Sequence, residues 1–310
     1  YKNGLKPMPE GESFYVRYAN GSTFVGAIQD LTDRGVIRNP KAFRLYARIQ
    51  DKELALNEGT YQLNPGMNAD EVLEALVSPV RRMVTVPEGW WIARVAKRLE
   101  EKQVCDADEY IALAASPEEF ASYVDFTLPE DSLEGYLYPD TYDLPPLLGA
   151  RETIRRQLQA FEQKVWQQVE DAEQIDRALK VASLVELEAG VDHERPIIAG
   201  VIENRLIRGQ NLELDATVLY ALQEWRNLGR GEVRTVDHPY NTYLNGGLPP
   251  GPIGSPSWRS IEAALNPAEH NYYFYVARPN REHLFSTTYQ QHRRNINSAR
   301  AEWRAGEATP

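Results

Sequence analysis

The amino-acid sequence predicts a multidomain α+β fold, in which small N-terminal α+β modules precede a mixed helical and β domain. Its 310 residues exceed the length that one compact core usually organises, so two or three domains are expected. Short strand-like and helix-like patterns alternate in the first half, whereas long helical patterns precede short strands in the second. The 42% hydrophobic and 25% charged fractions are those of ordinary globular domains.

The N-terminal part contains an internal repeat. Val16 and Val84 occupy equivalent positions in two copies that are separated by a constant number of residues. Each copy contains an alternating strand-like segment, then a glycine turn, then a helical pattern. The repeat predicts two related α+β units, at residues 13–79 and 80–128, after a leader at residues 1–12.

The stretch between the two repeats, residues 54–77, predicts a strand at 59–63 and a helix at 69–76. In the second repeat, Trp90 and Trp91 begin the predicted helix. Aromatic faces can stack on sugar rings, although at helical spacing at least one of the two rings is expected in the core.

The remaining domain, residues 129–310, is predicted to begin with long helices and to end in short strands. Amphipathic patterns predict helices at 150–170 and 172–188. Two strand-like segments, at 272–277 and 284–286, flank a polar turn. This order of elements again indicates an α+β domain.

The charge and cysteine content exclude several classes of site. Forty-five acidic and 34 basic side chains give a formal net charge of -11, which opposes sequence-independent attraction to nucleic acid or anionic lipid. The single cysteine, Cys105, excludes an intrachain disulfide and any cysteine-built zinc site. The five histidines show no HExxH-type pairing, so no metal and no cofactor are expected.

The sequence contains no candidate membrane span. No stretch approaches the roughly 20 consecutive apolar residues that a membrane-spanning helix needs. The chain begins at Tyr1 rather than at methionine, so we expect that an anchor or export segment precedes it.

Two carboxylates end the apolar helix at residues 178–187. Helical phase places Glu186 beside Ala182 on the buried side, whereas Glu188 continues the face of Arg177 and is expected to be structural. A glutamate buried in an apolar wall has a raised pKa and can donate a proton near neutral pH. The alternative is a structural glutamate that caps a neighbouring segment or pairs with an arginine such as Arg205, and helical phase does not separate the two.

A loop rich in glycine and proline, residues 246–253, cannot be regular helix or central strand. Hydroxyl, amide and tyrosine side chains at 240–243 precede it. Such a loop suits the wall of a sugar-binding cleft, where aromatic faces and amides meet rings and N-acetyl groups, but the same composition also forms ordinary turns.

Four segments, in matching order and spacing, resemble the endolytic murein transglycosylases of the MltG or YceG-like type. They are Leu133–Tyr142, Ala182–Glu188, Asn204–Leu206 with Leu214–Val218, and Tyr240–Ile253. The likeness extends over nearly all the chain and includes a LysM-like module that matches the region 13–79. Two departures, Ala216 in place of a frequent proline and Leu187 in place of a polar residue, leave details of substrate contact open.

The resemblance implies an extracytoplasmic enzyme of the cell wall. A single-pass N-terminal anchor would hold it in the cell inner (plasma) membrane, with the catalytic part on the periplasmic or extracytoplasmic side. Its partners would be the glycan strands of peptidoglycan and the cell-wall synthases of the elongation machinery, with no nucleic acid. Residues 129–310 would be the catalytic domain.

The implied reaction is lytic transglycosylation, which cleaves the bond between N-acetylmuramic acid (MurNAc) and N-acetylglucosamine (GlcNAc) within strands and forms 1,6-anhydro-MurNAc ends. The first glutamate of the Val-Glu-x-Glu segment, Glu186, is expected to act as general acid and then as base. The residues expected to orient loops or bind substrate are Glu134, Tyr138, Asn204, Asp215, Thr217, Tyr240, Asn241, Thr242, Tyr243, Gly247, Pro249 and His283. A muramidase-type hydrolase and a non-catalytic peptidoglycan-binding scaffold are the alternatives.

Overall fold

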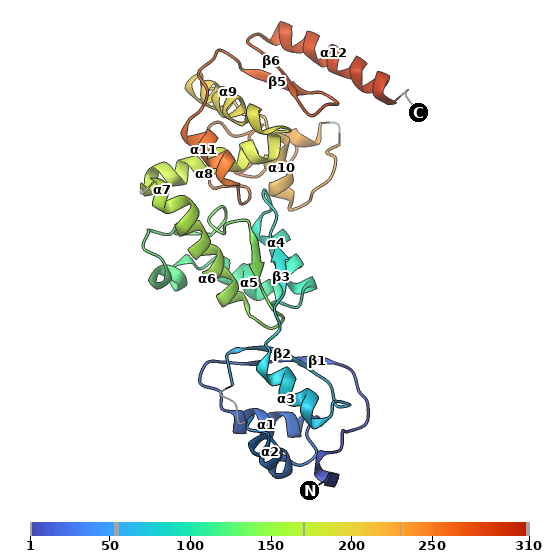
Figure 1. The fold of residues 1–310 in the computed structure, drawn as a ribbon. Helices are drawn as coiled ribbons and strands as arrows, with labels where there is room; N and C mark the ends of the chain where they lie inside the picture. Colours follow the sequence, from blue (N-terminus) through green and yellow to red (C-terminus); the bar gives the residue numbers. More distant parts are fainter. Residues whose placement is uncertain (1, 53–55, 170, 230, 308–310) are drawn as a thin grey trace. The chain divides into compact units, whose positions relative to one another are not determined.

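The fold is known from a computed structural model that describes residues 2–52, 56–169, 171–229 and 231–307. Two compact units make up the chain, and both are discontinuous in sequence (Figure 1). The first contains Tyr1–Val84, Arg98–Glu109 and Thr141–Thr153; the second contains Thr85–Lys97, Tyr110–Asp140 and Ile154–Pro310. The domain boundaries expected from the sequence stay predictions. Leu54 and Glu170, which belong to predicted segments, lie outside the described residues.

The first unit contains a two-stranded antiparallel sheet with helices around one core. Strand β1 (Phe14–Tyr18) pairs with β2 (Gly59–Leu63), so Val16 lies opposite Tyr61. The helices are α1 (Phe24–Asp33), α2 (Pro40–Ile49) and α3 (Ala69–Val77), after a 3₁₀ turn at Lys2–Leu5. The strand predicted at 59–63 and the helix predicted from 69 are confirmed, whereas the LysM-like identity of this region stays a prediction.

Helix starts in this unit follow side-chain caps that the sequence displays. Thr23 caps α1, Asn39 caps α2, and Asn68 forms a reciprocal capping box with Glu71 at α3. Each cap accepts a hydrogen bond from a backbone amide that has no partner inside the helix, which typically stabilises a helix by about 1 kcal/mol.

A second two-stranded sheet and several helices follow α3 in the sequence. Strand β3 (Met83–Thr85) pairs with β4 (Thr141–Asp143). The helices that follow β3 and β4 are α4 (Ile92–Glu101), α5 (Ala107–Ala114), a 3₁₀ segment (Pro117–Tyr123) and α6 (Ala150–Phe161). The helix predicted at 150–170 is interrupted, because a π-helical turn at Glu162–Trp166 separates α6 from α7 (Gln167–Val169).

The second unit is built around α8 (Ala172–Glu188), whose central residues are buried against α9, α10 and α11. The remaining helices are α9 (Arg195–Ile207), α10 (Asp215–Leu222), α11 (Trp258–Leu265) and α12 (Tyr289–Glu307), with 3₁₀ turns at Asp192–Glu194 and Glu232–Arg234. Strands β5 (Phe274–Ala277) and β6 (His283–Ser286) form an antiparallel hairpin that packs against α12 (Figure 1). The structure therefore confirms a mixed α+β fold.

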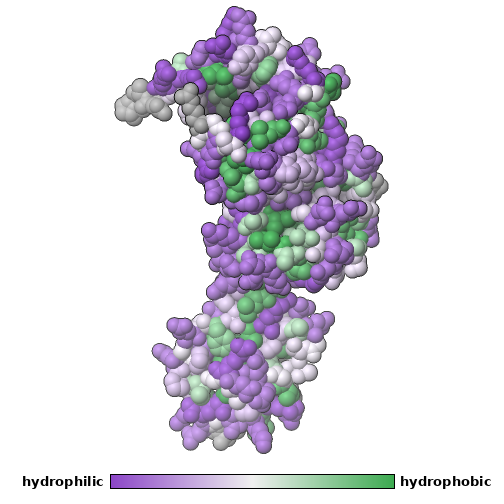
Figure 2. All heavy atoms as spheres, turned by 180° about the vertical axis from the view of Figure 1, so that it is seen from behind, coloured by the Kyte–Doolittle hydropathy of each residue, from purple (hydrophilic) through white to green (hydrophobic). Residues whose placement is uncertain are grey.

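The surface agrees with the acidic, polar composition. On the face drawn in Figure 2, hydrophilic residues predominate and apolar residues form only small separate patches. Within the described ranges, no helix combines the length and the apolar character that crossing a membrane requires.

Candidate active site

The two glutamates at the end of α8 point to different surroundings. An α-helix turns by 100° per residue, so Glu186 and Glu188 lie about 200° apart around the helix axis. Glu186 contacts the start of α11, and Glu188 contacts strand β5. Both carboxylates therefore lie at the end of the same helix, but the tertiary structure gives them different neighbours.

Glu186 is held by three donors. Its Oε2 accepts hydrogen bonds from the backbone N of Ser257, at 2.9 Å, and from the Ser257 hydroxyl, at 2.6 Å. Nη1 of Arg195 lies 3.1 Å from its Oε1. The side chains of Glu186 and Arg195 are only 6% and 11% exposed, so this ion pair is largely removed from water.

These contacts fix the Glu186 side chain in place, because each of its two carboxyl oxygens has a partner. The buried position predicted by helical phase is present, since the Glu186 side chain is only 6% exposed. An arginine partner, which the structural alternative expects, is present as Arg195 in place of the suggested Arg205. The catalytic role of Glu186 stays a prediction.

The loop after β3 contacts the same helix end. A Cβ atom on Gly89 would lie 2.9 Å from Cδ2 of Leu187, and Gly89 has a φ of +71°. Both the steric clash and the positive φ therefore disfavour any residue with a side chain at this position. Its N donates to the carbonyl oxygen of Ser255, and N of Ser255 donates to the carbonyl oxygen of Trp90. Burial and the charge of Glu186 raise the pKa of neighbouring Glu88.

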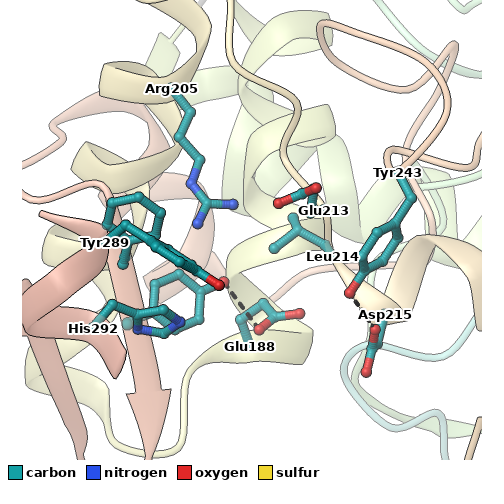
Figure 3. Close-up of a pocket in the computed structure, with 10 residues that line it drawn as sticks. Glu188, Arg205, Glu213, Leu214, Asp215, Tyr243, Tyr289 and His292 are labelled. Atoms are coloured by element: carbon teal, nitrogen blue, oxygen red, sulfur yellow. Dashed lines mark hydrogen bonds between the residues drawn. The ribbon is translucent and has the colours of Figure 1, made fainter. Parts of the chain in front are cut away.

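Glu188 lines a cavity of about 320 Å³, drawn in Figure 3. The lining residues are Glu188, Arg205, Glu213, Leu214, Asp215, Tyr243, Phe274, Tyr275, Tyr289 and His292. The hydroxyl of Tyr275 donates to Oε2 of Glu188 at 3.0 Å. Burial raises the pKa of Glu188, the Tyr275 hydrogen bond opposes this shift, and the charge of Asp215 adds to it. The glutamate expected to be structural thus combines a raised pKa with a position in the lining of a cavity.

Three further hydrogen bonds fix the walls of this cavity. Arg205 donates through Nε to the carbonyl oxygen of Tyr273, at 2.6 Å, and through Nη1 to that of Leu212. Tyr243 donates through its hydroxyl to Oδ1 of Asp215, at 2.6 Å. In Figure 3 the Arg205 guanidinium points toward the space between Glu188 and Glu213. The cavity therefore presents carboxylates, one guanidinium and aromatic rings.

The cavity lining also includes a histidine whose pKa is lowered. Burial, and next the charge of Arg205, lower the pKa of His292. Its Nδ1 is buried and has no hydrogen-bond partner among the residues that the structure describes. No sequence pattern pointed to His292, because it lies in α12, a helix that was not predicted.

Of the predicted substrate-binding residues, Asp215 and Tyr243 line the cavity. Four others support its walls from behind. Thr217 and Thr242 share a buried 2.9 Å hydrogen bond between their hydroxyl oxygens, and Thr242 also accepts from the backbone N of Leu214. Asn204 and Asn241 each donate through Nδ2 to two backbone carbonyl oxygens.

Other predicted residues lie outside the cavity lining. His283 is bonded through Nδ1 to Oε2 of Glu194 at 2.7 Å, and its ring packs edge-on against Tyr275. Tyr138 and Pro249 are buried, and Gly247 has a φ of +85° in its loop. These positions favour structural roles.

Glu134 and Tyr240 belong to a second group of side chains. Glu134 is buried and accepts from the backbone N of Ile92, at 3.1 Å, and from the hydroxyl of Tyr220, at 3.3 Å. Burial raises its pKa from 4.5 to about 8 against the opposing effect of these hydrogen bonds. The rings of Tyr220 and Tyr240 lie 4.8 Å apart.

Comparison with known proteins places this chain in a family. An endolytic murein transglycosylase of Bacillus subtilis is 29% identical over 94% of this chain and 86% of its own length. A second, from Streptococcus pneumoniae serotype 2, is 27% identical over 95% of this chain, which spans 60% of that longer relative. The crystal structure of a putative yceG-like protein from Listeria monocytogenes superposes with a TM-score of 0.62 at 29% identity, over 91% of this chain and 98% of that one. The YceG-like family matches residues 16–298, and the chain therefore belongs to this family.

Proposed function

We propose that this chain is a lytic transglycosylase that cleaves the MurNAc–GlcNAc bond within peptidoglycan strands and leaves 1,6-anhydro-MurNAc ends. Membership of the YceG-like family and similarity to proteins named endolytic murein transglycosylase support the substrate and the reaction. The cavity at the end of α8 supports the site, because it is hollow, polar and lined by tyrosines.

The observation that carries the assignment of the proton donor is the position of Glu188. Its carboxyl group lines the 320 Å³ cavity, and burial raises its pKa, so the group holds a proton at a higher pH than an ordinary glutamate. Because Tyr275 donates to Oε2, Oε1 is the oxygen left to face a substrate. We therefore assign the acid and base role to Glu188 in preference to Glu186.

In the first step, Glu188 donates its proton to the glycosidic oxygen as the bond from that oxygen to the muramyl anomeric carbon breaks. Positive charge then develops on the sugar ring, and the carboxylates of Asp215 and Glu213 lie at the cavity to stabilise it.

In the second step, the muramyl C6 hydroxyl attacks the anomeric carbon and the Glu188 carboxylate removes the hydroxyl proton. The carboxyl group of Glu188 is thereby restored. The step uses no water molecule and needs no second carboxylate as a nucleophile. Because the nucleophile belongs to the substrate, its effective molarity can reach on the order of 10⁵ M. The resulting product is a 1,6-anhydro end.

Glu186 is assigned a positioning role. Its ion pair with Arg195 and its hydrogen bonds from Ser257 tie the end of α8 to the starts of α9 and α11. These contacts hold the turn that carries Glu188. Loss of Glu186 would then reduce activity through altered geometry or stability.

The test is digestion of purified sacculi, with mass analysis of the sugar ends that are produced. We expect 1,6-anhydro ends from the unmodified protein and a rate lowered by about 10²- to 10⁴-fold in Glu188→Gln. Glu262→Gln, an exposed glutamate of α11, is the control and should retain full activity.

Each other outcome overturns a part of the proposal. Full loss in Glu186→Gln with activity retained in Glu188→Gln would return the acid role to Glu186. Reducing ends would identify a muramidase-type hydrolase. Strand binding without any released muropeptide would identify a non-catalytic scaffold.

The same function requires access to the cell wall, so we propose an extracytoplasmic location with a membrane anchor upstream of Tyr1, near the cell-wall synthases of the elongation machinery. Fractionation of the complete gene product, followed by protease treatment of spheroplasts, tests the location. Protection from external protease would contradict it.

A further inference from the structure

Three tryptophans surround one arginine near the start of α4. The guanidinium carbon of Arg94 lies 4.1 Å from the ring centre of Trp90, 6.0 Å from that of Trp91 and 5.9 Å from that of Trp225. Trp91 and Trp225 are themselves 6.1 Å apart, centre to centre. Segments distant in sequence, the start of α4 and the chain after α10, thus form one aromatic cluster.

The cluster combines an exposed ring with a cation that has no polar partner. Trp225 is 51% exposed, whereas Trp91 is 3% exposed and supports the cluster from below. Across the described ranges, the Arg94 side chain makes no hydrogen bond and no ion pair, and its cation–π contacts are with the three indole rings. Partial burial lowers the pKa of Arg94. Its N–H donors therefore remain available to an acceptor that arrives from solvent.

The cluster is connected to the catalytic cavity through two shared segments, α10 and residues 240–243. Asp215 and Tyr243 join these segments at the cavity through a 2.6 Å hydrogen bond. Tyr220 and Tyr240 join them again, with ring centres 4.8 Å apart, and the ring of Tyr220 packs edge-on against Trp91 at 6.1 Å. At 1.5 Å per residue, Asp215 and Tyr220 are separated by about 8 Å along α10.

Buried Glu134 fixes the base of this cluster. It accepts from the backbone N of Ile92, directly after Trp91, and from the hydroxyl of Tyr220. One carboxyl group thus holds both the start of α4 and the tyrosine that packs against Trp91. The rings stand on a rigid base, which reduces the entropy lost when a ligand stacks on them.

We propose that Trp90, Arg94 and Trp225 form a subsite, here called the tryptophan subsite, for an N-acetylated sugar of the glycan strand outside the catalytic cavity. The apolar face of the sugar ring would stack on the indole of Trp225. The acetamido carbonyl oxygen would accept a hydrogen bond from Arg94, a donor that a sugar without this group would leave unused. The choice of a glycan strand as ligand rests on the proposed function.

Binding is tested with the non-cleaving Glu188→Gln protein and tetra-N-acetylchitotetraose, by isothermal titration calorimetry. We expect Trp225→Ala and Arg94→Ala each to weaken binding by about fivefold to tenfold. Arg94→Lys retains the charge without the planar guanidinium and should recover part of this loss. Trp303→Ala removes a comparably exposed tryptophan, 48% exposed in α12, and should bind as the parent does.

A second measurement uses proteins with Glu188 intact and sacculus-derived glycan strands. Trp225→Ala should raise KM about fivefold to tenfold while kcat changes less than twofold, because the subsite holds substrate without contacting the cleaved bond. Circular dichroism of each variant confirms the fold. A fall in kcat with KM unchanged would contradict a binding role.

The two proposals fail in distinguishable ways. If Trp225→Ala and Trp303→Ala bind the oligosaccharide equally well, the tryptophan subsite is wrong even when strands are cleaved. If Trp225→Ala weakens binding but the unmodified protein releases no anhydro ends, the subsite is upheld and the proposed cleavage reaction is wrong.

Discussion

The hydroxyl group of Tyr275 donates a 3.0 Å hydrogen bond to Oε2 of Glu188, although 87 residues separate the two in sequence. Tyr275 lies in β5, and Glu188 is the last residue of α8. The strand therefore reaches across to the end of the helix and fixes one oxygen of the carboxyl group. The orientation and the pKa of the proposed acid both depend on this contact.

Removal of this hydroxyl, in Tyr275→Phe, should move the alkaline limb of the pH–rate profile to higher pH. The hydrogen bond lowers the pKa of Glu188, so its loss raises that pKa. Because a general acid must begin protonated, activity should then persist to higher pH. The profile of kcat/KM against pH measures the shift, and a limb that moves downward would contradict the proposed role.

The opposite shift is expected for Asp215→Asn. The negative charge of Asp215 raises the pKa of Glu188, and its removal lowers that pKa. The alkaline limb should therefore move to lower pH, with reduced kcat because a carboxylate that faces the developing positive charge is lost. Equal profiles for Asp215→Asn and Tyr275→Phe would show that neither residue acts through Glu188.

The Glu186–Arg195 ion pair should be important for stability. Arg195→Gln leaves a carboxylate that is only 6% exposed without its cation, which typically costs about 3 kcal/mol or more. We expect a melting temperature lower by roughly 5–10 °C. The double variant Arg195→Gln/Glu186→Gln removes both charges and should recover much of this loss.

An exposed ion pair provides the control for that measurement. Arg34 and Asp30 are 46% and 34% exposed, and such surface pairs contribute about 0–1 kcal/mol. Arg34→Gln should therefore leave the melting temperature nearly unchanged. If both arginine variants lower it equally, the Glu186–Arg195 pair has no special structural role.

The stability of the protein should become less dependent on pH in Glu134→Gln. Burial raises the pKa of Glu134 from 4.5 to about 8, so between these values the unfolded chain has released a proton that the folded chain still holds. The contribution of Glu134 to the stability of the fold is therefore complete below about pH 4.5. It decreases as the pH rises from about 4.5 to about 8 and changes no further above that pH.

The amide in Glu134→Gln does not ionise and can still accept from the backbone N of Ile92. The melting temperature of this variant should therefore fall less than that of the parent between about pH 5 and pH 8. Parallel melting curves for the two proteins across this range would contradict a buried, protonated Glu134.

Local sequence patterns were sufficient to predict much of the framework. Alternating residues predicted β2 at Gly59–Leu63, and a helical period predicted α8 with both glutamates at its end. The interruption of α6 by a π-helical turn, and α12 itself, were not predicted. Helix α12 is polar over most of its length and is buried mainly where it packs against the β5–β6 hairpin, so its own sequence gives a weak periodic signal.

The sequence by itself determined much of the order of the elements, the family likeness and the pair of carboxylates that ends α8. Only the tertiary structure decided which carboxylate pairs with Arg195 and which one lines a cavity with Tyr275. The physical reason is the distance along the sequence over which each property is determined. Helical phase depends on neighbouring residues, whereas the partners and the burial of a glutamate depend on segments that come together from distant parts of the chain.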